Sequence, residues 1–204
     1  MSLTRRSAVQ LPLAILLAVL FFGLSIHAQA PGRQIPVDQL IRLGDVEAEG
    51  VSTPQFDYNV RGMSTKRDGR MEWLMVRAEY RTAKEWTDEV TITFYVVLRG
   101  DEDDLPEGAG NPNMFTGTVT YVNVRKGDHE ATMFLDPNTF ERYGEVVAAA
   151  AVVSIEGQDA GFMADPRPQN PWWETQTPVA TPLLDRSESP WALIEIEKHG
   201  TLQP

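Results

Sequence analysis

The chain contains no cysteine and only three histidines. The missing cysteines exclude a disulfide framework, a thiolate nucleophile, Cys-bound zinc and a lipoprotein anchor. His27 lies in an apolar N-terminal segment, so a two-histidine metal site would need His129 and His199 to meet in space. The G-x-S-x-G, Walker A, G-x-G-x-x-G and H-E-x-x-H patterns are absent as well. We therefore predict no catalytic, cofactor-binding or metal-binding residues and a protein that is not an enzyme.

Basic residues are also scarce, because 18 Lys and Arg stand against 29 Asp and Glu, for a net charge of −11. Nucleic acid and anionic membrane surfaces both need clustered cations, so neither is expected as the main partner. The acidic residues are concentrated in the tract Asp101-Glu102-Asp103-Asp104, with Glu107 nearby. The tract lacks the ligand spacing of an EF-hand loop. We interpret it as a solvated loop that protects a sheet edge, with calcium binding as the alternative.

The first 30 residues contain no acidic side chain. Arg5 and Arg6 precede an apolar run over residues 11–26, and small residues follow, including Ala28 and Ala30. This order is typical of a secretory signal peptide. The apolar run is longer than most signal cores and short for a membrane span, so a retained inner-membrane anchor is the alternative. In both cases we predict that the rest of the chain works outside the cytoplasm, in the periplasm or as a secreted protein.

The exported part is more acidic than the whole chain. Removal of residues 1–30 takes away two basic residues and no acidic one, which leaves a formal charge of −13 on 174 residues. A domain of this size buries roughly 70% of the surface that its unfolded chain exposes. Without disulfides in an oxidising compartment, its stability must come from the packing of that core.

Apolar residues of the exported part alternate with period two in several segments. This alternation is typical of strands with one buried face. It predicts strands over residues 70–81, 89–98, 115–124 and 131–135, with weaker ones near 41–47 and 56–61. A turn at Lys126-Gly127-Asp128 is expected between the third and fourth of these.

Residues 144–155 carry conflicting signals. Four alanines at 148–151 favour helix, whereas the valines and Ile155 favour a strand. We predict a strand that is buried on both faces, where the alanines let another layer come close. Asp136 and Pro137 just before it are expected to cap and begin a short helical turn.

Many short strands with little amphipathic helix predict an all-β fold, an antiparallel immunoglobulin-like β-sandwich, with a barrel of another topology as the rival. The expected organisation is a signal or anchor helix at 1–30, a linker at 31–37, the sandwich at 38–161 and a Pro- and Trp-rich segment at 162–204. Six of the 14 prolines fall between Pro166 and Pro190. We expect this segment to pack over the sandwich and to end in an extended piece near residues 191–197.

Tryptophans of the C-terminal segment are the residues predicted to bind a partner. Trp172 and Trp173 are adjacent in a proline-rich stretch, and Trp191 follows Pro190. Tryptophan is enriched at the energetic centres of interfaces, but it also covers the ends of cores. Because consecutive residues of an extended chain point in opposite directions, we expect one of Trp172 and Trp173 to face inward and the other outward.

The run Leu183-Leu184-Asp185-Arg186-Ser187-Glu188-Ser189-Pro190-Trp191-Ala192 resembles a Leu-x-Arg-x-x-Ser/Thr-Pro-aromatic-Ala ending. Such an ending is similar to that of small exported immunoglobulin-like proteins encoded with type IV pilus machinery. The resemblance implies an accessory or binding role in the cell envelope, without catalysis and without functional residues that could be carried over. Leu193-Ile194-Glu195-Ile196-Glu197 follows here, where that family continues with more aromatic residues.

The sequence thus favours an exported, non-enzymatic module that binds another protein of the cell envelope, related to a pilus or to secretion. The alternative is a carbohydrate- or calcium-binding sandwich, with or without hydrolytic activity, that uses Trp172, Trp173 and the acidic loop. In a further alternative, residues 11–26 keep the protein tethered to the membrane as a structural subunit.

Overall fold

The computed structural model describes residues 36–54, 71–101, 103, 105, 112–192 and 201–202, within a compact unit that spans Ile35–Pro204. The expected signal or anchor at 1–30 and the expected strand at 56–61 lie outside the described residues. So do His199 and most of the acidic loop. In the part of the chain that is described, no helix is long and apolar enough to cross a membrane.

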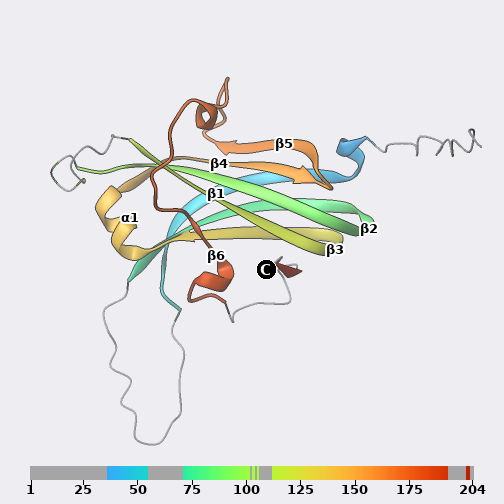
Figure 1. The fold of residues 1–204 in the computed structure, drawn as a ribbon, viewed down its shortest axis with the longest axis horizontal. Coiled ribbons are helices and arrows are strands. Elements are labelled where there is room, and N and C mark those ends of the chain that lie inside the picture. Colours follow the sequence, from blue (N-terminus) through green and yellow to red (C-terminus); the bar gives the residue numbers. More distant parts are fainter. Residues whose placement is uncertain are drawn as a thin grey trace, which may run out of the picture. The chain divides into compact units, whose positions relative to one another are not determined.

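The structure is almost entirely β (Figure 1). Its elements are η1 (Val37–Gln39), β1 (Ile41–Ser52), β2 (Glu72–Arg99), β3 (Asn113–Leu135), α1 (Pro137–Tyr143), β4 (Glu145–Ile155), β5 (Gln158–Asp165), η2 (Trp172–Glu174), β6 (Leu184–Asp185), η3 (Arg186–Glu188) and β7 (Thr201–Leu202). All pairings between these strands are antiparallel.

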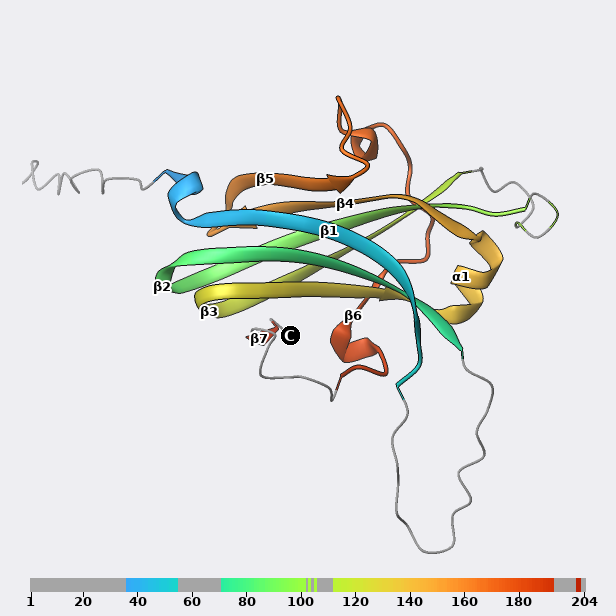
Figure 2. The same ribbon diagram turned by 180° about the vertical axis from the view of Figure 1, so that it is seen from behind.

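The strands form two layers that share β2 and β3 (Figures 1 and 2). In the first, the β1 layer, residues 72–82 of β2 pair with β1 on one side and with residues 127–135 of β3 on the other, and β6 follows. In the second, the β4 layer, the order is β5, β4, residues 86–99 of β2 and residues 113–125 of β3, with β7 at its edge. This arrangement confirms the predicted all-β sandwich.

The prediction of separate strands at 70–81 and 89–98, and again at 115–124 and 131–135, was wrong in one respect. Each pair is one long strand that bends from one layer into the other. The pairing of β2 with β3 resumes after an irregularity between Thr82 and Trp86, so the ladder continues around the bend. Gly127, expected in a turn, has φ +143° and lets β3 bend without ending.

Alternate residues of the strands fill the space between the layers. In β2, the side chains of Val90, Ile92, Phe94, Val96 and Leu98 are all fully buried. The prediction for residues 144–155 is confirmed as β4, with Ala149 and Ala151 in this core. Ala150 points to the opposite face, into a second apolar cluster on the outside of the β4 layer. Ala149 and Ala151 therefore let the β1 layer come close on one side of β4, as expected, and Ala150 packs with Trp173 on the other side.

Helix α1 joins β3 of one layer to β4 of the other. As predicted, Asp136 is its N-cap, with the side chain accepting a hydrogen bond from the Thr139 N–H at 3.1 Å, and Pro137 begins the helix. Gly144 ends it with φ +84°, a backbone conformation that favours glycine. The connection thus has a defined start and end.

The predicted domain boundary at residue 161 falls inside β5, which continues to Asp165 because Met163 packs into the main core. Pro166 then ends the strand, since proline has no N–H to donate. Residues 166–192 run over the sandwich without central-strand pairing, as expected of a proline-rich segment. Trp191 and Ala192, expected in a final extended piece, lie in a turn, and residues 193–200 are outside the described part.

The C-terminal segment closes the β3 side of the sandwich. The Val179 N–H donates to the Met114 carbonyl at 2.8 Å and the Leu183 N–H to the Thr116 carbonyl at 2.9 Å, along the β4 layer. Leu184 and Asp185 then pair with β3 in the β1 layer as β6. One extended segment therefore ties the same edge of both layers together.

The Leu-x-Arg-x-x-Ser-Pro-Trp-Ala run forms a closed local structure. Asp185 and Glu188 make a reciprocal capping box around η3. Arg186 is buried and donates from Nε to the Trp191 carbonyl at 2.9 Å. The Ser189 hydroxyl donates to the Arg186 carbonyl at 2.8 Å and accepts from the Trp191 N–H at 3.2 Å. These hydrogen bonds within the run thus hold the end of the C-terminal segment in a fixed turn.

Because two tyrosines are buried, we predict that the fold loses stability at high pH. Burial raises the pKa of Tyr80 well above its usual value and raises the pKa of Tyr121 to about 12. The pKa of each tyrosine is higher in the folded state than in the unfolded state. The contribution of the buried, protonated tyrosine to the free energy of unfolding is therefore fully present below about pH 10 and is lost as the pH rises toward 12. We expect unfolding free energy at pH 11 to fall by about 1.4 kcal/mol per tyrosine relative to pH 9. Urea denaturation of wild type and Tyr121→Phe checks this, because the variant should lose about half as much.

Candidate partner-binding surface

Trp173 is buried on the outer face of the β4 layer. Its ring stacks on Tyr95 with centroids 5.9 Å apart and meets the ring of Phe162 at 5.0 Å. Val97, Met114 and Ala150 complete the same cluster. With only 7% of its surface exposed, Trp173 covers the sheet and is part of the fold.

Trp172 and Trp191 are each half-buried against other aromatic rings. Trp172 packs edge-on against Trp173 at 5.2 Å, so the structure places Trp173 inward and Trp172 nearer the surface. Trp191 lies on the β1 layer, where it stacks on Phe134 at 4.6 Å and meets Trp73 edge-on at 5.8 Å. The three predicted tryptophans therefore lie on two different layers and do not form one surface.

The most exposed tryptophan side chain among the described residues is one that the sequence prediction missed. Trp86 is 51% exposed at the start of the second half of β2, directly opposite Arg125 of β3. The guanidinium of Arg125 lies over its ring, 4.9 Å from the centroid. We refer to Trp86 and Arg125 as the Trp–Arg pair.

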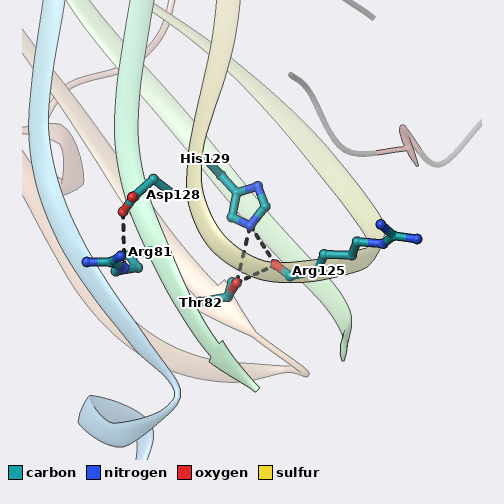
Figure 3. A network of polar contacts seen from close by, with 5 residues as sticks. All are labelled: Arg81, Thr82, Arg125, Asp128 and His129. Atoms are coloured by element: carbon teal, nitrogen blue, oxygen red, sulfur yellow. Dashed lines mark hydrogen bonds and ion pairs between the residues drawn. The ribbon is translucent and has the colours of Figure 1, made fainter. Parts of the chain in front are cut away.

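A hydrogen-bond network at the bend fixes the backbone of Arg125 (Figure 3). The Thr82 hydroxyl donates to the Arg125 carbonyl at 2.6 Å. Nε2 of His129 lies 2.6 Å from the same oxygen and 3.2 Å from the Thr82 hydroxyl oxygen. Because a carbonyl oxygen only accepts, we assign a proton to that ring nitrogen. His129 also stacks on Tyr80, with centroids 5.2 Å apart, so the network is anchored to the core.

The Arg125 side chain extends away from this network, as Figure 3 shows, and it is exposed. Two other basic side chains near the bend are already paired with carboxylates: Arg81 pairs with Asp128 at 3.2 Å, and Lys84 donates to both carboxylate oxygens of Glu156. Within the described ranges, no carboxylate lies at ion-pair distance from Arg125. Its guanidinium therefore keeps donors available for a partner, beside a flat apolar ring.

Trp and Arg are the residue types most often found at the energetic centres of protein interfaces. Here the network at the bend holds the arginine backbone in place, and the arginine covers one part of the tryptophan ring. In the sequence, Trp86 stands between Glu85 and Thr87-Asp88, in the polar gap between two predicted strands. An isolated tryptophan in a polar gap was the signal that could have pointed to it.

No group of three or more potential ligands for a metal ion is present in the described ranges of the chain. The calcium alternative depends on Glu102, Asp104 and Glu107, which lie outside those ranges. The two-histidine alternative depends on His199, which also lies outside them. His129 is engaged in the network at the bend.

Comparison with known proteins gives a family and a fold. A protein-family model matches residues 36–200 of the chain. A crystal structure of a protein from Akkermansia muciniphila is similar, with a TM-score of 0.67 and 19% sequence identity. The alignment covers 81% of this chain and 93% of that chain. At this identity the likeness shows the shared fold alone. No curated protein matches the sequence.

Proposed function

We propose that the chain, which belongs to the family whose model matches residues 36–200, acts as an exported, non-enzymatic protein-binding module of the cell envelope. The N-terminal signal pattern supports export to the periplasm or beyond, with anchorage to the inner membrane through residues 11–26 if the segment is retained. The C-terminal run that resembles pilus-associated immunoglobulin-like proteins supports a role beside pilus or secretion machinery.

The observation that carries the proposal is the Trp–Arg pair. The half-exposed ring of Trp86 keeps a large apolar area in contact with water, and a partner that covered the ring would remove that area from solvent. Trp86 belongs to neither apolar cluster of the fold. Its ring and the Arg125 guanidinium offer a partner a stacking surface and several hydrogen-bond donors.

Trp86→Ala is expected to abolish partner capture while leaving the fold intact. We expect at least a ten-fold loss of the captured partner, because central Trp anchors contribute 2 kcal/mol or more to binding. The unfolding free energy should change by less than about 1 kcal/mol, since the side chain lies outside the core. Affinity capture of the tagged protein from solubilised envelopes, followed by mass spectrometry, measures the first effect, and urea denaturation the second.

Met71→Ala is the matched control, because Met71 is also more than half exposed and immediately precedes β2, at the end of the β1 layer away from the bend. Capture by this variant should equal that of the wild type. If Trp86→Ala and Arg125→Ala both retain the same envelope proteins as the wild type, the binding surface is elsewhere.

A further inference from the structure

The outer face of the β4 layer has a central part without charged side chains. Its residues project from four neighbouring strands, in rows that the strand register defines. We call this surface the threonine face; it consists of Thr91, Thr93, Thr118, Thr120, Val152, Ser154 and Phe162. Two charged residues border this central part: Asp159 of β5 pairs with Ser154 at the end of one row, and Glu89 of β2 lies in the next row.

Hydroxyl groups on the threonine face occur in two directly opposed cross-strand pairs. The oxygens of Thr91 and Thr120 are 3.0 Å apart, and so are those of Thr93 and Thr118. Each pair uses one O–H as a donor, which leaves the second O–H and several lone pairs available. Neighbouring pairs repeat along the strands at roughly 7 Å, two residues apart. The face thus presents a regular array of donors and acceptors.

An aromatic ring borders the array in the same row. Phe162 of β5 pairs with Val152 of β4, which is aligned with Thr93 of β2 and Thr118 of β3. Phe162 is 36% exposed and rests against the ring of Trp173, which fixes its position. The row therefore runs from an exposed aromatic ring, across an apolar strip, to a pair of hydroxyls.

We propose that the threonine face binds a neutral polysaccharide chain. Sugar rings present hydroxyls that exchange hydrogen bonds with the threonine pairs and C–H faces that pack on an aromatic ring. A neutral occupant suits a face without charge, because no buried carboxylate or ammonium group is left without a partner. The exported domain's charge of −13 repels acidic glycans, so the occupant is an uncharged one. This site is separate from the Trp–Arg pair and goes beyond the proposed protein-binding role.

Affinity gel electrophoresis of the exported protein tests the proposal. The gels contain neutral soluble polysaccharides, namely dextran, glycogen, xyloglucan and laminarin, each run beside a gel without glycan. We expect at least one of them to retard the wild type. Thr118→Lys should weaken that binding at least ten-fold, since it breaks a hydroxyl pair and places a long charged side chain on the face.

Thr181→Lys is the matched control, because Thr181 is exposed on the C-terminal segment and the substitution adds the same charge. Phe162→Ala provides a second variant of the face in case Thr118→Lys lowers the melting temperature. Retardation by none of the four polysaccharides overturns the proposal. It is overturned equally if both face variants bind like the wild type, or if ultracentrifugation shows that the face joins two copies of the chain and that Thr118→Lys separates them.

Discussion

Gly144→Ala is expected to lower the free energy of unfolding by about 4 kcal/mol. This is the largest loss of stability that we predict for any substitution, although it adds only one methyl group. Gly144 has φ +84° and ψ −142°, a combination available mainly to glycine. A Cβ atom there would lie 2.3 Å from the Arg99 carbonyl oxygen and 2.6 Å from Gly100 Cα. Both are backbone atoms, so the clash is relieved only by moving the start of β4 away from β2.

Gly157→Ala separates the two causes of that loss. Gly157 also has a positive φ, +75°, but a Cβ atom there would meet nothing within 4 Å. It should therefore cost only the backbone strain, about 1 kcal/mol. Urea denaturation of both variants measures the difference. Equal losses would show that the close approach of Gly144 to β2 is not what makes glycine necessary there.

Arg186→Ala is expected to lower the free energy of unfolding by about 3 kcal/mol. The substitution removes the donor to the Trp191 carbonyl and leaves a gap where the buried side chain packs. Trp191 should then leave its stacking position on Phe134, because the turn that holds it has lost the hydrogen bond from Arg186. A red shift of tryptophan emission and faster proteolytic cleavage after residue 185 would accompany the loss of stability.

Arg167→Ala is the control for charge, since Arg167 is exposed on the same C-terminal segment. Its unfolding free energy should stay within about 0.5 kcal/mol of the wild type. A wild-type proteolysis pattern for Arg186→Ala would contradict the role assigned to the C-terminal run.

Most of the strand pattern was readable from the sequence because most strands have one buried face and one exposed face. The period-two alternation found both halves of β2 and β3, and β-branched residues outweighed the alanines in β4. Continuity around the bend was not readable, because residues 83–88 are mostly polar and resemble a loop. The strand continues there because Trp86 and Thr87 pair again with Arg125 and Val124 of β3, about 40 positions further along the chain.

The candidate site was less predictable than the fold. Adjacent Trp172 and Trp173 stood out by composition, yet Trp173 is buried because the small residues Ala148 and Ala150 leave room for its ring on the β4 layer. The Trp–Arg pair depends on cross-strand register, which brings Trp86 and Arg125 together across the bend. Register of this kind follows from tertiary packing, so the pattern of either strand alone does not reveal it.

Site-specific photo-crosslinking in the producing cells shows directly whether the Trp–Arg pair binds an envelope protein. A photoreactive phenylalanine derivative is placed at position 86 or, as a control, at Glu49, which is exposed on the β1 layer. We expect a discrete adduct with an envelope protein at position 86 and none at position 49. No adduct at position 86, or the same adducts at both positions, would contradict it.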